Sequence, residues 1–239
     1  MERESIRSNG RSWAAALKAT VPVLLGYTTL GAAFGLLLVN AGLPFWLAPL
    51  MSLVLYAGAA QFMAIGLLAS GAGVLEMALL VLALNARHAV YGLSLLGRFE
   101  PCKRWRPYLV FGLTDETYGL LSTLDAPEGS DEAQREAFYA AVTILNQAYW
   151  NAGTLVGALV GMAAKGIAGF DAAGLDFALT ALFVVLLVEQ LRSMRRPEPY
   201  LVAFAAAALA FLALGPERLL LAAILLSVAG ILALRRRLP

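Results

Sequence analysis

Long apolar runs separated by short polar clusters dominate the chain. Several of the runs reach the roughly 20 residues that a helix needs to cross the hydrocarbon core of a bilayer. A transmembrane barrel would instead show short segments in which apolar and polar residues alternate. The pattern therefore predicts an all-α, polytopic integral membrane helical bundle with about six to eight membrane segments. The apolar runs cover residues 14–39, 44–70, 74–97, 136–164, 175–191, 199–214 and 219–234.

The composition supports this class and excludes several others. Hydrophobic residues make up 60% of the 239 residues and charged residues only 14%, whereas a soluble domain has about 25% charged residues. The single cysteine, Cys102, excludes an intramolecular disulfide and a cysteine-based metal cluster. The sequence carries neither HExxH nor GxSxG and no phosphate-binding loop. We therefore expect no enzyme, no cofactor and no bound metal, and any uphill transport must use an ion gradient or a partner protein.

Basic residues outside the apolar runs give two competing topologies. They gather in the N-terminal segment, in 98–106, in 192–196 and in 235–237. If 44–97 and 138–191 each make one net crossing, all four clusters and both termini lie in the cytoplasm, as the positive-inside rule favours. This version needs broken or re-entrant helices, which are tolerated only where they are buried or line a cavity. We favour it, and expect the breaks in the stretches YAGAAQF, LASGAG, LNARH and LNQAYWNAG.

A simple count of eight spans, with 107–124 as one of them, is the alternative topology. Its two three-helix units, 14–97 and 107–191, would form an inverted repeat, an arrangement of related halves found in many transporters. The two topologies place loop 98–106 on opposite faces of the membrane. Labelling Cys102 from one side would therefore separate them.

The stretch LNARHAVYGLSL, residues 84–95, places ionisable side chains within an apolar run. Such groups are costly in a membrane and mark function by default. On a helix Arg87 shares a face with Tyr91, while Asn85 and His88 share the neighbouring face. We predict that Asn85, Arg87 and Tyr91 bind substrate and that His88 is one candidate proton carrier. Alternatively, Arg87 is a structural ion-pair partner of an acid elsewhere and His88 a packed core histidine.

A second polar cluster, FGLTDETYGL at 111–120, contains two adjacent acids. On a helix Thr114, Asp115 and Tyr118 lie along one side, with Glu116 beside them. Either carboxylate could face a substrate ammonium group, carry a proton, or pair with Arg87. We prefer Asp115 as the proton-coupling residue, because Thr114 and Tyr118 flank it on its own face, and keep Glu116 as the alternative.

A third polar cluster begins the stretch LNQAYWNAGTLVGALVG, residues 145–161. Asn146 and Trp150 are four residues apart, as are Gln147 and Asn151, so each pair shares one helix face. We predict that Asn146, Gln147 and Trp150 contribute to the substrate site. Alternatively, the amide side chains only form hydrogen bonds between helices.

Two rows of glycines are predicted to pack helices closely. Gly153, Gly157 and Gly161 recur every four residues, as do Gly31 and Gly35, and such rows allow another helix to approach. These rows offer more close-packing surface than one small bundle obviously uses. We therefore expect at least one row to bind a small hydrophobic subunit.

Five motifs taken in order resemble the AzlC family. They are VLYAGAAQF, ALNARHAVYGLSL, FGLTDETYGL, LNQAYWNAGTLVGALVG and GLDFALTALFVVLLVEQ. The resemblance covers residues 14–195 of what we expect to be a single transporter domain, followed by a two-helix extension at 199–239. It implies the large subunit of a bacterial inner-membrane exporter of branched-chain amino acids, with methionine a substrate of some members.

The resemblance also implies a separately encoded small membrane subunit of the AzlD type. Valine, leucine and isoleucine are zwitterions, so a site for them needs a cation for the carboxylate and an anion or carbonyls for the ammonium. Arg87 and one of the acids meet this need. Two other classes stay open from sequence: a uniporter or channel for small zwitterions, and a membrane scaffold subunit without transport activity.

Overall fold

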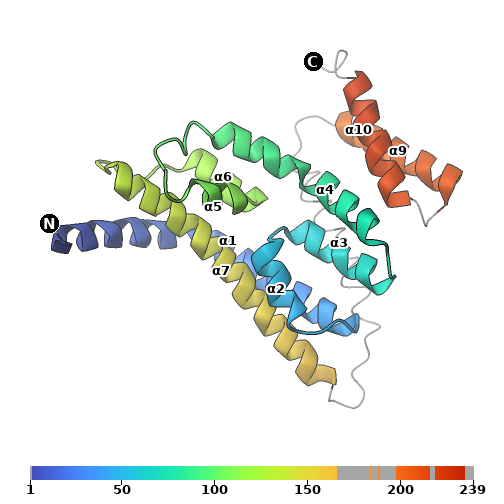
Figure 1. Cartoon of the computed structure of the whole chain (residues 1–239), viewed down its shortest axis with the longest axis horizontal. Helices are drawn as coiled ribbons and strands as arrows, with labels where there is room; N and C mark the ends of the chain where they lie inside the picture. Colours follow the sequence, from blue (N-terminus) through green and yellow to red (C-terminus); the bar gives the residue numbers. More distant parts are fainter. Residues whose placement is uncertain (1, 166–183, 185–187, 189–197, 216–218, 235–239) are drawn as a thin grey trace. The chain divides into compact units, whose positions relative to one another are not determined.

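The computed structural model describes residues 2–165, 184, 188, 198–215 and 219–234, and the regular elements of these residues are all helices (Figure 1). Two of the described helices are long and apolar enough to cross a membrane, over Gly10–Asn40 and Val74–Leu95. The all-α prediction is confirmed, while the apolar run 175–191 lies outside the described residues apart from 184 and 188. The helices are α1 (Glu2–Asn40), α2 (Leu47–Val54), α3 (Gly58–Ala69), α4 (Val74–Leu95), α5 (Arg106–Phe111), α6 (Asp115–Thr123), α7 (Glu132–Lys165), α9 (Glu198–Leu214) and α10 (Leu219–Leu234).

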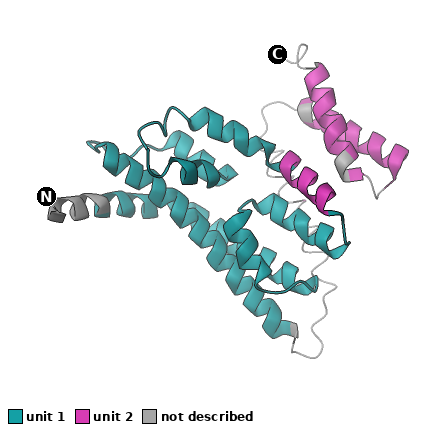
Figure 2. Ribbon diagram, in the orientation of Figure 1, with its two compact units in different colours: residues 1–73, 84–175 teal, residues 74–83, 176–239 magenta. Residues whose placement is uncertain are grey.

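The chain divides into two compact units (Figure 2). The first comprises Met1–Gly73 and Leu84–Leu175, and the second comprises Val74–Ala83 and Asp176–Pro239. Within the second unit α9 packs against α10, where a Cβ atom at Gly230 would lie 2.8 Å from a methyl group of Val202. Every residue predicted to bind substrate, carry a proton or pack helices belongs to the first unit.

The first unit is built on α1 and α7, its two longest described helices, which pack against each other (Figure 1). The two glycine rows face one another in this interface. A Cβ atom at Gly31 would lie 2.7 Å from the Trp150 carbonyl oxygen, and one at Gly153 would lie 2.5 Å from the Thr28 carbonyl oxygen. Real Cβ atoms do not approach backbone so closely, so the helices touch backbone to backbone at these positions.

The remaining row glycines continue the same contact. A Cβ atom at Gly35 would overlap the backbone of Thr154, and one at Gly157 would overlap the backbone of Ala32. Gly161 extends the row against side chains of α1. The expectation that one row stays open for a partner subunit is therefore wrong for this structure, because each row is covered by the other.

Two apolar segments among the described residues of the first unit are interrupted. The first break separates α2 from α3 at residues 55–57, at the start of the stretch YAGAAQF where a break was expected. Tyr56 has φ of 40° there, a left-handed conformation that is uncommon for a residue with a side chain. The expected turn in LASGAG is also present, between α3 and α4, with Gly71 at φ of 69°.

The second interruption was not expected. Residues 107–124, taken as one span in the eight-span count, form α5 and α6 with a break at 112–114. The Thr114 hydroxyl oxygen accepts the backbone N–H of Thr117 and caps α6, and Asp115 and Glu116 occupy its first turn. Both features favour a helix start at this point, because an N-cap oxygen satisfies a free N–H group and acids complement the helix dipole.

Two other expected breaks are absent, because α4 runs unbroken through LNARH and α7 unbroken through LNQAYWNAG. In α7 the amide side chains of Asn146 and Gln147 bond to neighbouring elements rather than to their own backbone. The helical ladder of α7 therefore stays intact, and its polar residues do not mark a break.

The glycine interface predicts that Gly157→Ala destabilises the protein. The added methyl group overlaps the Ala32 backbone, and overpacking of this kind costs about 1–3 kcal/mol, which lowers the thermal unfolding midpoint measured in detergent. Gly26→Ala is the matched control, since a Cβ atom there has open space around it; it should keep or raise the midpoint. Equal midpoints for the two variants would contradict the glycine contact.

Candidate functional site

An ion pair joins α4 to α6. Arg87 Nη1 lies 2.8 Å from Asp115 Oδ2, and the Tyr91 hydroxyl donates a 2.6 Å hydrogen bond to Asp115 Oδ1. Both oxygens of the carboxylate are thus engaged by α4. The pair is only partly covered, with side-chain exposures of 41% for Arg87 and 43% for Asp115.

Aromatic side chains line the same contact between α4 and α6. The rings of Tyr91 and Tyr118 stack with centroids 4.3 Å apart and 12° between their planes. The His88 ring centroid lies 5.8 Å from that of Tyr91, so His88 borders the ion pair. Asn85 contributes a buried Oδ1 atom that has no hydrogen-bond partner among the described residues.

Glu116 turns toward a different helix from its neighbour Asp115. The Tyr27 hydroxyl of α1 donates a 2.6 Å hydrogen bond to Glu116 Oε2 and lies 2.5 Å from the Thr114 hydroxyl oxygen. Thr114 and Thr117 are joined at 3.0 Å, and Asn146 Nδ2 donates to the Thr117 hydroxyl oxygen at 3.0 Å. The two acids thus belong to separate polar groups, one on each side of α6.

Gln147 bonds to the segment interrupted between α2 and α3. Its Nε2 atom donates to the Leu53 carbonyl oxygen at 3.2 Å, and its Oε1 atom accepts from the Tyr108 hydroxyl of α5 at 2.7 Å. Carbonyl groups in the last turn of a helix have no partner within that helix, so Gln147 satisfies a group that the break leaves free. Asn146, the preceding residue, bonds to Thr117 in α6, beyond the other break.

Trp150 continues the polar face of α7. Its Nε1 atom donates to Gln61 Oε1 at 3.0 Å, Gln61 Nε2 donates to the Ser52 hydroxyl at 3.0 Å, and Ser52 donates to the Thr154 hydroxyl at 3.0 Å. The Trp150 ring meets Tyr27 edge-on with centroids 5.4 Å apart. These bonds tie α2 and α3 to α7 within a buried interior.

The structure therefore sorts the predicted site residues into groups. Arg87, Tyr91 and Asp115 meet directly, with His88 beside them, while Asn146 belongs to the Glu116 group. Gln147 and Trp150 bond to the segment that contains α2 and α3. The sequence analysis missed several polar residues that complete these groups, and the available signal was a single polar side chain inside an apolar run. The missed residues are Tyr27, Ser52, Gln61, Tyr108 and Thr154.

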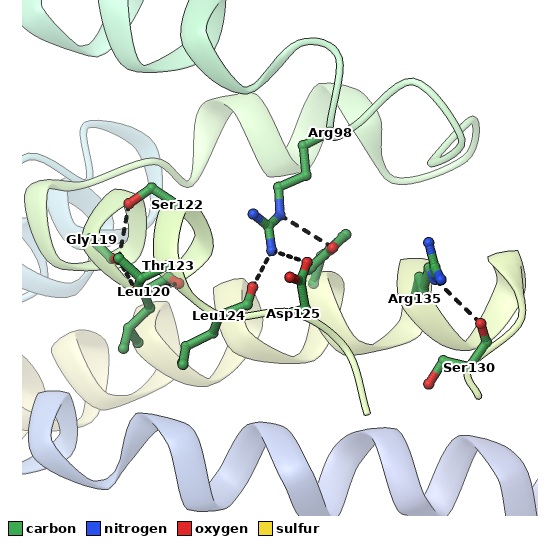
Figure 3. A network of polar contacts seen from close by, with 10 residues as sticks. Arg98, Gly119, Leu120, Ser122, Thr123, Leu124, Asp125, Ser130 and Arg135 are labelled. Atoms are coloured by element: carbon green, nitrogen blue, oxygen red, sulfur yellow. Dashed lines mark hydrogen bonds and ion pairs between the residues drawn. The ribbon is translucent and has the colours of Figure 1, made fainter. Parts of the chain in front are cut away.

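A basic loop, residues 98–106, follows α4 and is bonded to the residues that follow α6. Arg98 donates from Nη2 to the Leu124 carbonyl oxygen and, at 2.5 Å, to Asp125 Oδ1 (Figure 3). Its guanidinium group also lies 5.3 Å from the ring centroid of Tyr139. These bonds connect the residues just after α4 to those just after α6, and so support the position of the Arg87–Asp115 pair. The described residues contain no cluster of side chains suited to hold a metal ion.

Comparison with known proteins places this arrangement in a family. A family model described as AzlC protein matches residues 22–164. An uncharacterized membrane protein of Helicobacter pylori is 39% identical over 92% of this chain and 93% of its own length. The branched-chain amino acid transport protein AzlC of Bacillus subtilis is 30% identical over 94% of this chain and 87% of its own length.

A third relative, inner membrane protein YgaZ of Escherichia coli, is 31% identical over 72% of this chain and 70% of its own length. No solved structure matches the chain. The AzlC family is not an enzyme family, which agrees with the sequence expectation. Because the family model covers more than half of the chain and relatives align along most of it, this membrane protein belongs to the AzlC family.

Proposed function

We propose that the chain is the large subunit of an exporter that carries valine, leucine and isoleucine, with methionine a further candidate, across the bacterial inner membrane. An ion gradient drives the export, and a small AzlD-type membrane subunit completes the transporter. The observation that carries the proposal is the alignment, over 94% of this chain, with a relative named branched-chain amino acid transport protein.

The Arg87–Asp115 pair supports this proposal as the place where an amino acid zwitterion binds. The substrate carboxylate takes the place of Asp115 on the Arg87 guanidinium, whose planar fork suits a carboxylate. The substrate ammonium group then pairs with the Asp115 carboxylate. One partly exposed ion pair is replaced by two, so both protein charges stay compensated during binding.

Selectivity among aliphatic side chains then depends on an apolar wall. Adding or removing one methylene group in such a pocket changes binding by only about 1–3 kcal/mol. Valine, leucine and isoleucine therefore compete for one site, and methionine, which is unbranched and flexible, fits the same wall.

Helix lengths support the topology with the basic loop inside. Helices α2 and α3 have 8 and 12 residues, whereas α4 has 22. Only α4 among these three reaches the roughly 20 residues that a spanning helix needs. We propose that α2 and α3 form a re-entrant pair and that α4 returns the chain to the cytoplasm, which puts residues 98–106 on the cytoplasmic side together with the N-terminus.

Counterflow of labelled valine in proteoliposomes tests the proposed function. The purified chain is reconstituted with and without the small subunit, and vesicles loaded with unlabelled valine are expected to take up the label transiently. An imposed ion gradient should then produce net accumulation, which a channel or uniporter would not give. Absence of counterflow in both preparations would contradict a transporting role and favour a scaffold subunit.

Neutral substitutions of the ion pair separate substrate binding from a purely structural role. Arg87→Gln should raise the valine KM roughly tenfold to a hundredfold, because a hydrogen bond to a charged group is worth about 1.5–3 kcal/mol. The double variant Arg87→Gln with Asp115→Asn should be at least as weak as the single one, since each charge binds one end of the zwitterion. Arg104→Gln, an exposed residue away from the pair, is the matched control. Recovery of transport in the double variant would show that the pair is only structural.

A labelling test of the predicted topology needs a cysteine other than Cys102. Cys102 is only 1% exposed, and burial together with the nearby Glu136 carboxylate raises the pKa of its thiol to about 11. Because the thiolate is the reactive form, the labelling rate of Cys102 should rise about tenfold per pH unit below that pKa and be low near pH 7.

An exposed replacement probe avoids this problem. Lys103→Cys in a Cys102→Ser background should react with an impermeant maleimide only where the cytoplasmic face is accessible, that is, in inverted membrane vesicles or permeabilised cells. Labelling of that variant from outside intact spheroplasts would contradict the re-entrant topology and favour eight spans.

A further inference from the structure

A row of hydroxyl groups connects Glu116 to α7. Starting at the carboxylate, the row passes through the hydroxyls of Tyr27, Thr114 and Thr117, with successive separations of 2.6, 2.5 and 3.0 Å. It ends at Asn146, whose Nδ2 atom donates to the Thr117 hydroxyl oxygen at 3.0 Å. The three hydroxyl residues and Asn146 are buried, at most 8% exposed.

Each hydroxyl has a single proton, and this fixes how the row can be arranged. When Glu116 is ionised it only accepts, so the Tyr27 proton is given to Glu116. Thr114 gives its proton to Thr117, and the contact between the Tyr27 and Thr114 hydroxyls is then left without a donor. When Glu116 is protonated its own O–H can donate to Tyr27, whose proton is then free to turn to Thr114, and every bond of the row has a donor.

The charges around the two acids favour Glu116 over Asp115 as the proton carrier. A proton on Asp115 would leave the Arg87 guanidinium without its counter-ion, whereas Glu116 has no ion pair among the described residues. The titratable groups that face Glu116 are Tyr27 from α1 and Tyr56 from the α2–α3 connection. On α6 itself the neighbouring charge is that of Asp115.

We infer that Glu116 carries the proton of the transport cycle, and that its protonation completes the row of hydrogen bonds from Tyr27 through Thr114 to Thr117. The inference rests on the proposed function and replaces the sequence-based preference for Asp115. No proton crosses the row: one proton enters or leaves at the Glu116 carboxylate, and the hydroxyl protons only reorient. Protonation at one side of the membrane thereby changes the hydrogen bonding between α1 and the start of α6.

The first test is spectroscopic and does not need transport. In infrared difference spectra recorded against pH, the carbonyl band of a protonated carboxylic acid should be lost in Glu116→Gln. The band should titrate at a displaced pH in Tyr27→Phe, which removes the hydrogen bond to Glu116. Tyr149→Phe is the matched control, because its hydroxyl bonds to Thr20 in the same α1–α7 interface but outside the row. A band that titrates identically in Tyr27→Phe and in the unsubstituted protein would contradict the link between Glu116 and the Tyr27 hydroxyl, and with it the inference.

The second test compares pH-driven accumulation of valine with valine counterflow. With one proton per valine, a gradient of one pH unit sustains about a tenfold valine gradient. Thr117→Val should abolish this accumulation while counterflow continues, and Thr117→Ser should restore it, because serine returns the hydroxyl. Accumulation in Thr117→Val equal to that of the unsubstituted protein would overturn the inference. If the unsubstituted protein shows no counterflow at all, the proposed function fails while the infrared test still decides the role of Glu116.

Discussion

A break in a helix within an apolar segment leaves backbone groups that neither lipid nor the helix itself can satisfy. The described residues of the first unit contain two such breaks, at 55–57 and at 112–114, and the unbroken helix α7 bonds to the segments at both. Gln147 bonds to the Leu53 carbonyl oxygen, a backbone group left free before one break, and Asn146 bonds to the Thr117 hydroxyl in the helix that starts after the other. Because these two residues are consecutive, a single turn of α7 serves both interrupted segments.

The contact between α1 and α7 makes this arrangement possible. Glycines on both helices allow their backbones to touch, which brings Tyr27 of α1 close to Trp150 of α7 and to the start of α6. Consecutive residues on a helix point about 100° apart, so Asp115 reaches α4 while Glu116 reaches α1. The capped start of α6 therefore keeps two adjacent negative charges in separate environments, one paired with an arginine and the other bonded to a tyrosine.

The sequence predicted the helical class, the family and the faces of α4 and α6 that meet, because apolar runs and helical spacing carry that information. It also located the break at YAGAAQF, where glycine lies within an apolar segment. The break predicted in LNQAYWNAG is absent. An amide side chain can bond to the backbone at a break in a neighbouring segment, as Gln147 does, and does not require a break in its own helix. The break at 112–114 was missed even though Thr114 followed by two acids is typical of a helix start. Tyr27 and Gln61 were missed because their partners lie far away in sequence, and only the fold brings them together.

The dependence of both breaks on α7 can be measured by hydrogen exchange of backbone amides, which reports local opening. Gln147→Leu should speed exchange at residues 55–61 and leave 114–118 unchanged, whereas Asn146→Leu should do the reverse. This reciprocal pattern would show that two consecutive side chains of α7 each stabilise one interrupted segment. Unchanged exchange at both breaks in both variants, or the same uniform increase throughout the first unit, would contradict the account.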